Sequence, residues 1–362
     1  MPLPFVSVLI DTYNHERFIA EAVESVLAQD FPAANREILV VDDGSTDRTP
    51  EILRKYEPQI RVLRKANGGQ ASAFNHGIPA CRGELIAFLD GDDWWAPEKL
   101  RAVCDTMTSN PAIGMMGSAF DEVQDGKPPK TITRVQQLRV NLSNGHQAEI
   151  FRLHRPYFGT SRLALRADVA RRCLPVPEPL VFEADEYLFT VAAALAGGVV
   201  SPEVLTHYRV HGESLFLAAG SSTRGLRRKQ CVLEALASSF RQVLPQLAVP
   251  PDALRAIIEI VQAEADQLRL SLDGGWSWEV VRAETTIYRA LHAEASWKSA
   301  AFRWVSMIPA LLLPPRAFYR SRRFLGSHPL YLQLRKHAIP VPPVTVPDTA
   351  AGTPATTVRH DS

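Results

Sequence analysis

The first third of the chain alternates short apolar runs with segments of helical periodicity. Strand-like runs occupy residues 6–10, 38–41, 60–63 and 85–89. Between and after them, apolar residues recur at helical spacing within 18–27, 49–56, 69–78 and 100–107. Strands that alternate with helices predict an α/β fold whose sheet is mostly parallel, Rossmann-like and flanked by helices.

The pattern changes after residue 112. Residues 113–215 contain several Pro and Gly turns and look less regular, whereas residues 224–291 repeat a charged helical pattern. Residues 341–362 are rich in Pro, Thr and Ala, which predicts a disordered tail. We therefore divide the chain into two halves of an α/β domain (1–112 and 113–215), a helical C-terminal extension (216–338) and a tail (339–362).

Length, charge balance and cysteine content limit the kinds of partner and the cellular compartment that we expect for this protein. The chain has 362 residues, 46% of them hydrophobic, which is enough to bury the core of an enzyme-sized domain. Its 40 basic and 39 acidic residues nearly balance, so the protein has no large net positive charge that would attract nucleic acid. We therefore expect no nucleic-acid partner. Four cysteines without a CxxC pair fit a reducing compartment. The N-terminus lacks a signal-peptide pattern, and we expect a cytoplasmic protein.

An acidic cluster directly follows the predicted strand at 85–89. Asp90, Asp92 and Asp93 fall within four positions, and carboxylates so close together repel one another unless water or a cation neutralises them. Oxygen ligands of this kind suit Mg²⁺ or Mn²⁺, which commonly join protein carboxylates to substrate phosphates. The alternative is an acidic turn that caps the next helix.

Two further loops lie at the same predicted edge of the sheet. Asp42 and Asp43 end the strand at 38–41, and a carboxylate in that position can accept from a base or a ribose hydroxyl. Asn67, Gly68 and Gly69 lead into a helix whose backbone N–H groups could approach a ligand. The chain contains neither GxxxxGK[ST] nor GxGxxG, which argues against a P-loop NTPase and an ordinary dinucleotide oxidoreductase.

These motifs, taken in order, resemble those of family-2 glycosyltransferases with a GT-A fold. VSVLIDTYN (6–14), VDDGSTD (41–47), NGG (67–69) and FLDGDD (88–93) match the family over roughly the first 110 residues. The resemblance continues more loosely to about residue 215, through 159–161, 184–188 and 207–212. It implies that residues 1–112 bind a nucleotide-sugar and that residues 113–215 bind the acceptor.

The resemblance also implies a role for individual residues. On the donor side these are Thr12 and Tyr13 in the nucleoside pocket, Asp43 at the base, Asn67 and Gly68 in the donor loop, and Asp90 at the ribose or a metal-bound water. Asp92 would ligate the metal, with His211 completing the metal or diphosphate shell, and Asp185 would be the general base. Arg209 is either a diphosphate contact or part of a surface ion pair.

The sequence departs from the family pattern at two positions. Asp11 stands where the family usually has proline, which adds a carboxylate without an assigned role. Ala184 stands in place of the first acid of the family's acidic pair, so Glu183 or Glu186 could compete with Asp185 as the base. One direct displacement at the anomeric carbon would invert its configuration, as most of the family does.

The implied activity is metal-dependent transfer from a nucleotide-sugar, foremost a UDP-sugar, to a saccharide or lipid-linked acceptor in cell-surface glycan synthesis. Two alternatives are a nucleotidyltransferase and a catalytically inactive nucleotide-sugar-binding module of a polysaccharide assembly complex. The usual Gly-rich, Lys/Arg-containing loop of nucleotidyltransferases is missing near the N-terminus.

An apolar stretch at 304–315 precedes four arginines interleaved with aromatic residues up to 324. Apolar and basic-aromatic stretches side by side suit an anionic membrane surface, and would place the protein at the inner face of the cell membrane. The alternative is a helix that packs on the catalytic domain while its arginines are solvated.

Overall fold

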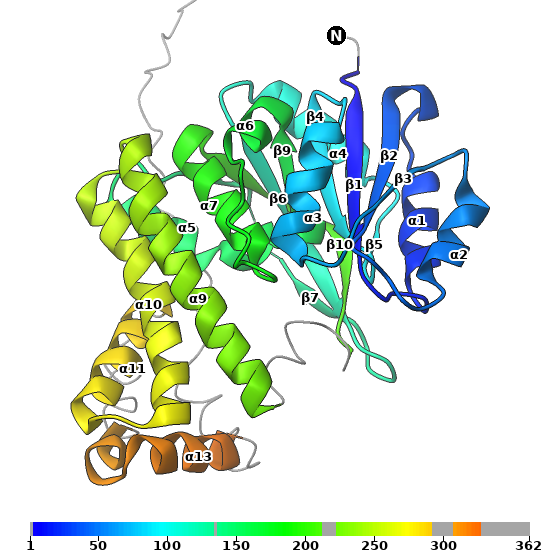
Figure 1. Ribbon diagram of the computed structural model, residues 1–362. Helices are drawn as coiled ribbons and strands as arrows, with labels where there is room; N and C mark the ends of the chain where they lie inside the picture. Colours follow the sequence, from blue (N-terminus) through cyan, green and yellow to red (C-terminus); the bar gives the residue numbers. More distant parts are fainter. Residues whose placement is uncertain (1–2, 134–135, 212–221, 292–306, 327–362) are drawn as a thin grey trace, which may run out of the picture.

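The computed structural model describes residues 3–133, 136–211, 222–291 and 307–326. It consists of one large mixed sheet with helices on both faces and a group of long helices packed to one side (Figure 1). The strands are β1 (Val6–Thr12), β2 (Arg36–Asp42), β3 (Arg61–Arg64), β4 (Leu85–Asp90), β5 (Trp94–Trp95), β6 (Met115–Val123), β7 (Lys130–Ile132), β8 (Leu138–Val140), β9 (Ala164–Arg166) and β10 (Gly198–Arg209).

The strand order is β3-β2-β1-β4-β9-β6-β10-β5, with β7 beside β6 and β8 beside β10. The first four strands are parallel, and β9 runs antiparallel between β4 and β6. Successive strands are added on one side of β1 up to β3, and the chain then crosses to the other side of β1 with β4. Open α/β sheets bind their ligands at such a switch point. Asp11 and Asp90 are register partners at this point.

Alternation along the strands divides the core into two layers. Val8 and Ile10 of β1 face one cluster with helix α1, whereas Leu9 faces the opposite cluster with helix α3. The helices are α1 (Ile19–Leu27), α2 (Thr49–Leu53), α3 (Gln70–Gly77), α4 (Lys99–Ser109), α5 (Gly145–Leu153), α6 (Ala167–Arg172), α7 (Ala184–Ala196), α9 (Thr223–Val243), α10 (Pro251–Asp273), α11 (Ser277–Leu291) and α13 (Pro315–Gly326).

The predicted strands and helices of the first 112 residues are confirmed, because their apolar patterns are strong and local. The irregularity expected for 113–215 is wrong: this segment contains β6, the 12-residue strand β10 and the 13-residue helix α7. β6 begins Met-Met-Gly-Ser-Ala-Phe and is buried along its first six residues. A strand covered on both faces shows no alternation of apolar and polar residues, so its period is not visible in the sequence.

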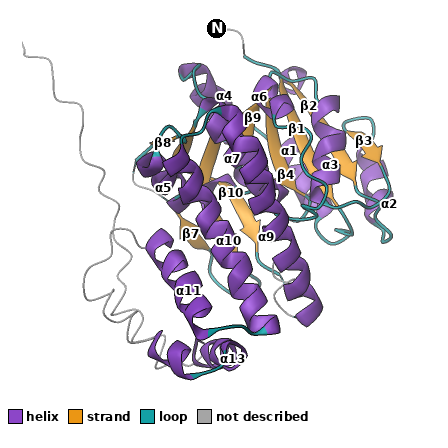
Figure 2. Ribbon diagram, turned by 60° about the vertical axis from the view of Figure 1, so that its left-hand side comes forward, coloured by secondary structure: helices purple, strands orange, loops and turns teal. Residues whose placement is uncertain are grey.

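The helical extension is confirmed as α9, α10 and α11, followed by helical residues 307–312 and by α13. α9 and α10 pack beside α5 and α7 and share the core on that face of the sheet (Figure 2). Within the described ranges, no helix is both long and apolar enough to cross a bilayer. The predicted tail lies outside the described residues, as do residues 304–306 of the apolar stretch.

Candidate active site

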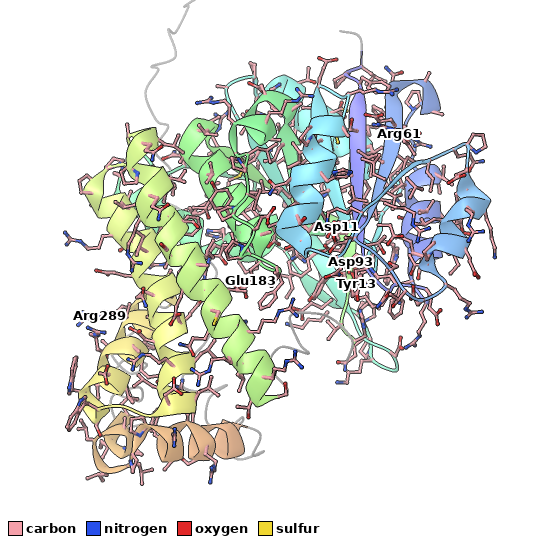
Figure 3. The ribbon with its side chains drawn as sticks, in the orientation of Figure 1. Asp11, Tyr13, Arg61, Asp93, Glu183 and Arg289 are labelled. Atoms are coloured by element: carbon pink, nitrogen blue, oxygen red, sulfur yellow. The ribbon has the colours of Figure 1, made fainter. Side chains whose placement is uncertain are left out.

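Carboxylates converge where β1 and β4 end. Figure 3 shows Asp11, Tyr13 and Asp93 close together at the carboxyl ends of these strands. Asp90, Asp92 and Asp93 each place one carboxylate oxygen within 4.8 Å of the others. The predicted acidic cluster is therefore a compact group of side chains. Such a group of hard oxygen donors has the chemistry to hold Mg²⁺ or Mn²⁺.

The four aspartates of this region differ in their electrostatics. Burial, and then the negative charges of the neighbouring aspartates, raise the pKa of Asp90 well above its usual value. Burial also acts on Asp92, but a hydrogen bond from His211 and the nearby His15 outweigh it and lower the pKa of Asp92. Asp92 is therefore the carboxylate of the cluster that most readily carries negative charge.

Asp93 is occupied by protein contacts. One oxygen accepts from the Ser161 hydroxyl at 2.5 Å and the other from the Arg209 backbone N–H at 2.8 Å. Burial, followed by the charge of Asp92, raises the pKa of Asp93 to about 7. Asp93 therefore joins the acidic loop to β10 and to the loop before β9, and it has less freedom than Asp92 to take a ligand.

Asp11, the departure from the family pattern, points into the same cluster. Its Oδ1 atom is buried and has no hydrogen-bond partner in the part of the chain that the structure describes. Burial, and next the charge of Asp92, raise the pKa of Asp11 to about 8. A buried carboxylate oxygen without a donor is costly in protein alone, and a bound cation or substrate hydroxyl would satisfy it.

The Asp43 side chain holds the NGG loop in place. Its carboxylate accepts from Lys65 Nζ at 2.5 Å, from Gly68 N at 3.0 Å and from Gly69 N at 2.7 Å. Gly69 has φ +84°, and an added Cβ would lie 2.7 Å from the Cα of Val181, so only glycine fits there. The Asp43 carboxylate therefore binds Lys65 and the backbone of the NGG loop, contacts that the sequence did not suggest.

Thr12, Tyr13 and Asn67 are further residues that the sequence predicted for the donor site. Thr12 is 3% exposed, and its hydroxyl lies 3.2 Å from Nδ1 of His15. Tyr13 is partly buried, whereas Asn67 is exposed at the tip of the NGG loop. A cavity of about 240 Å³ next to Tyr13 is lined by Asn14, Glu16, Arg17, Phe18 and Asp47.

Asp185 lies in the first turn of α7. Its Oδ2 atom accepts from Thr160 N at 3.0 Å, and its Oδ1 atom from the Glu186 backbone N–H at 2.9 Å. Burial raises the pKa of Asp185, and the Thr160 hydrogen bond opposes this in part. Thr160 is adjacent to Ser161, so one short loop contacts both Asp185 and the acidic cluster.

The two glutamates beside Asp185 are held elsewhere. Glu183 has a left-handed backbone (φ +57°) and pairs with Lys229 of α9 at 3.3 Å. Glu186 forms an ion pair with Arg155. Asp185 alone among these three contacts the loop that reaches the acidic cluster.

The end of β10 closes the site. His211 Nε2 lies 2.9 Å from Asp92 Oδ2, and no described residue partners its Nδ1. The Arg209 guanidinium donates to the Asp92 carbonyl at 2.9 Å, pairs with Glu21 and lies over the rings of Phe18 and Trp94. Arg209 thus takes part in an ion pair, one of its two predicted alternatives.

Sequence reasoning missed two participants. The Nε2 atom of His15 lies 4.0 Å from Asp92 Oδ2, and the Ser161 hydroxyl donates to Asp93 and to the Asp90 carboxylate at 3.5 Å. His15 immediately follows the DTYN motif, so its position in the sequence was the available signal. Trp95, which follows the cluster closely, is 3% exposed and packs in the core.

Comparison with known proteins identifies the family of the chain. The model of the family described as glycosyl transferase family 2 matches residues 7–169. A glycosyltransferase of Nostoc sp., itself uncharacterised, is 33% identical over 226 residues, which cover 60% of this chain and 68% of the relative. The chain belongs to glycosyltransferase family 2. It covers only 34% and 30% of the next two curated relatives.

Two further comparisons concern this family 2 glycosyltransferase. The poly(ribitol-phosphate) β-N-acetylglucosaminyltransferase TarS of Staphylococcus aureus is 37% identical over 99 residues, or 26% of this chain and 17% of TarS. The mannosyltransferase PcManGT from Pyrobaculum calidifontis, solved with GDP-Man and Mn²⁺, superimposes with a TM-score of 0.53 at 21% identity, covering 93% of this chain and 88% of that one. The expected GT-A fold is thereby confirmed.

Proposed function

We propose that this family 2 enzyme transfers a sugar from a nucleotide-sugar to a saccharide or lipid-linked acceptor, with inversion, in cell-surface glycan synthesis. The observation that carries the proposal is one continuous site. Asp92 and His211 lie at one end of it, and the Thr160–Ser161 loop connects the acidic cluster to Asp185. Family membership removes the nucleotidyltransferase alternative.

The donor is proposed to bind along the carboxyl ends of β1, β2 and β4. Thr12 and Tyr13 would line the nucleoside pocket, and the Asp43-anchored loop with Asn67 and Gly68 would border it. Asp90 would contact the ribose or a metal-bound water. A UDP-sugar is the first donor to test, because TarS transfers N-acetylglucosamine and has been crystallised with UDP.

A divalent ion, Mg²⁺ or Mn²⁺, fits the cluster. The donor set is rich in carboxylate oxygen, and Asp11 Oδ1 and His211 Nδ1 are buried without a hydrogen-bond partner among the described residues. We propose Asp92 and His211 as its ligands. When bound, the ion would act as a Lewis acid toward the leaving diphosphate.

The protein's own groups supply the rest of the mechanism. Asp185, oriented by Thr160, would accept the proton of the acceptor hydroxyl as its oxygen attacks the anomeric carbon. Burial holds the pKa of Asp185 above that of an ordinary aspartate, which strengthens it as a base. Arg209, now paired with Glu21, would turn its guanidinium to the diphosphate. One displacement with one base inverts the configuration.

We extend the proposal to the organisation of the chain. Residues 1–112 would bind the donor, 113–215 the acceptor, and 216–338 would form an extension that places the protein at the inner face of the cell membrane. TarS acts on poly(ribitol-phosphate), a polymeric acceptor, as its name states.

The test is a panel of UDP-, GDP- and dTDP-sugars, assayed for slow donor hydrolysis with Mn²⁺ or Mg²⁺. The proposal predicts metal-stimulated release of one nucleoside diphosphate, UDP foremost. Product NMR with an accepted saccharide should then show inversion, and retention would reject the single-base scheme. Binding of a nucleotide-sugar without turnover on any acceptor would instead identify an inactive binding module.

A further inference from the structure

Large apolar side chains are exposed in one part of the molecule. Among the described residues, the highly exposed large hydrophobics are Trp276 (71%), Trp278 (58%), Ile308 (51%), Leu311 (63%) and Leu312 (77%). All belong to residues 276–312, beyond the catalytic domain. Isolated exposed apolar residues are ordinary, but their confinement to one segment indicates a contact surface.

The segments that carry these side chains pack against one another. Leu270 of α10, Val280 of α11, Ala310, and Phe318 and Tyr319 of α13 form a separate small core. The Arg316 guanidinium donates to the Leu272 carbonyl at 2.8 Å, which ties α13 to the end of α10. The turn that bears Trp276 and the residues before α13 therefore belong to one packed unit (Figures 1 and 2).

α13 adds positive charge to this unit. Its sequence, PRAFYRSRRFLG, contains four arginines and no acidic residue. Phe318 and Tyr319 face the small core, whereas Arg316 and Arg320 are exposed. Arg322 differs because it pairs with the buried Glu284. Among the described side chains of α13, Phe318 and Tyr319 are thus buried, whereas Arg316 and Arg320 are exposed.

We propose that this unit docks on an anionic phospholipid bilayer. The docking surface consists of Trp276, Trp278, Leu311, Leu312, Arg316 and Arg320. Tryptophan and leucine side chains enter the interfacial region of a bilayer favourably, and arginine is attracted to anionic headgroups. The combination of exposed apolar and basic groups fits such a surface better than it fits water.

The position of this unit adds a functional consequence, which rests on the proposed function. The parallel strands run from the N-terminal end of the molecule toward the end where α13 lies (Figure 1). The candidate active site is at the carboxyl ends of these strands, which point toward the end of the molecule where α13 lies (Figures 1 and 3). A docked enzyme would meet the headgroup of a lipid-linked acceptor.

Vesicle flotation of the full chain tests the docking surface. We expect the protein to float with vesicles of equal parts phosphatidylglycerol and phosphatidylcholine and not with phosphatidylcholine alone. Trp276→Ser/Trp278→Ser and Arg320→Glu should each weaken binding by about tenfold or more, equivalent to about 1.4 kcal/mol. Arg241→Glu is the matched control, because Arg241 is exposed in the last turn of α9, away from the docking surface.

Three results would overturn the proposal. They are no flotation of the natural chain, equal flotation of all variants, or a natural dimer that Trp276→Ser/Trp278→Ser converts to monomer without any vesicle binding. The last result would assign the surface to a second copy of the chain. Circular dichroism checks that each variant is folded, and Arg320→Glu serves if the double variant is not. Donor hydrolysis measured without vesicles tests the proposed function separately.

Discussion

The Nε2 atom of His211 lies 2.9 Å from Oδ2 of Asp92, although 119 residues separate the two in the chain. This contact brings the end of β10 to the acidic loop after β4. It lowers the pKa of Asp92 against the opposing effect of burial. The two side chains that we propose as metal ligands are thus adjacent in the protein.

Replacement of His211 by alanine should weaken the affinity of the protein for the metal ion and leave the fold intact. We expect the Mn²⁺ concentration for half-maximal donor hydrolysis to rise by about tenfold or more, the scale seen when a metal site loses a supporting group. His76→Ala, on an exposed part of α3, is the control. An unchanged Mn²⁺ dependence in His211→Ala would exclude His211 from the metal shell.

Asp185→Asn should abolish transfer but not donor binding. Loss of a general base lowers a rate by about 10²–10⁴-fold, and the acceptor-side position of Asp185 leaves the nucleotide contacts in place. Single-turnover transfer and calorimetric binding of the nucleoside diphosphate measure the two effects. Glu183→Gln should retain transfer, because Glu183 pairs with Lys229. Loss of transfer in Glu183→Gln together with retained transfer in Asp185→Asn would identify Glu183 as the base.

Local pattern was enough to predict the strands and helices of the first 112 residues. The strand ends at Asp11, Asp43 and Asp90 follow from short apolar runs, and parallel strands bring their carboxyl ends to one edge. Long-range contacts were beyond this reasoning. Nothing in the sequence indicates that the Ser161 hydroxyl reaches Asp93, or that Lys229 of α9 pairs with Glu183.

The same limit explains how Asp43 and Arg209 were interpreted. A carboxylate after a strand is an acceptor for any donor, and only the tertiary structure reveals that backbone N–H groups of Gly68 and Gly69 occupy it. For Arg209, the ion pair with Glu21 depends on how α1 packs beside β5. The sequence motifs therefore predicted where the site lies, and the tertiary contacts show which partner each side chain binds.

Asp43→Asn should loosen the NGG loop. The new amide would direct N–H groups at donors on Lys65, Gly68 and Gly69, which costs about 1–3 kcal/mol. Binding of the nucleoside diphosphate should weaken by about tenfold or more, as measured by calorimetry. Asp105→Asn, exposed on α4, is the control. Equal affinity in the two variants would contradict a donor role for the loop.

Glu183 should make the protein less stable as the pH rises. Burial raises its pKa from 4.5 to about 7, so the folded state holds a proton that the unfolded state releases between these values. The free energy of unfolding should therefore fall from pH 4.5 to about 7, by roughly 3 kcal/mol at most from this group.

Glu183→Gln should flatten this decline, because glutamine does not titrate. Urea unfolding at several pH values, compared with the exposed control Glu178→Gln, measures the difference. If the free energy of unfolding depends on pH equally in Glu183→Gln and in the natural chain, the pKa of Glu183 is not raised in the folded state.

The central claim is a nucleotide-sugar site whose metal is held by Asp92. The most direct measurement is metal-dependent hydrolysis of the best donor by the natural chain, by Asp92→Asn and by Asp125→Asn, an exposed control. We predict that Mn²⁺ stimulates hydrolysis in the natural chain and in Asp125→Asn, and that Asp92→Asn loses the stimulation. Full metal-stimulated hydrolysis in Asp92→Asn would contradict the account.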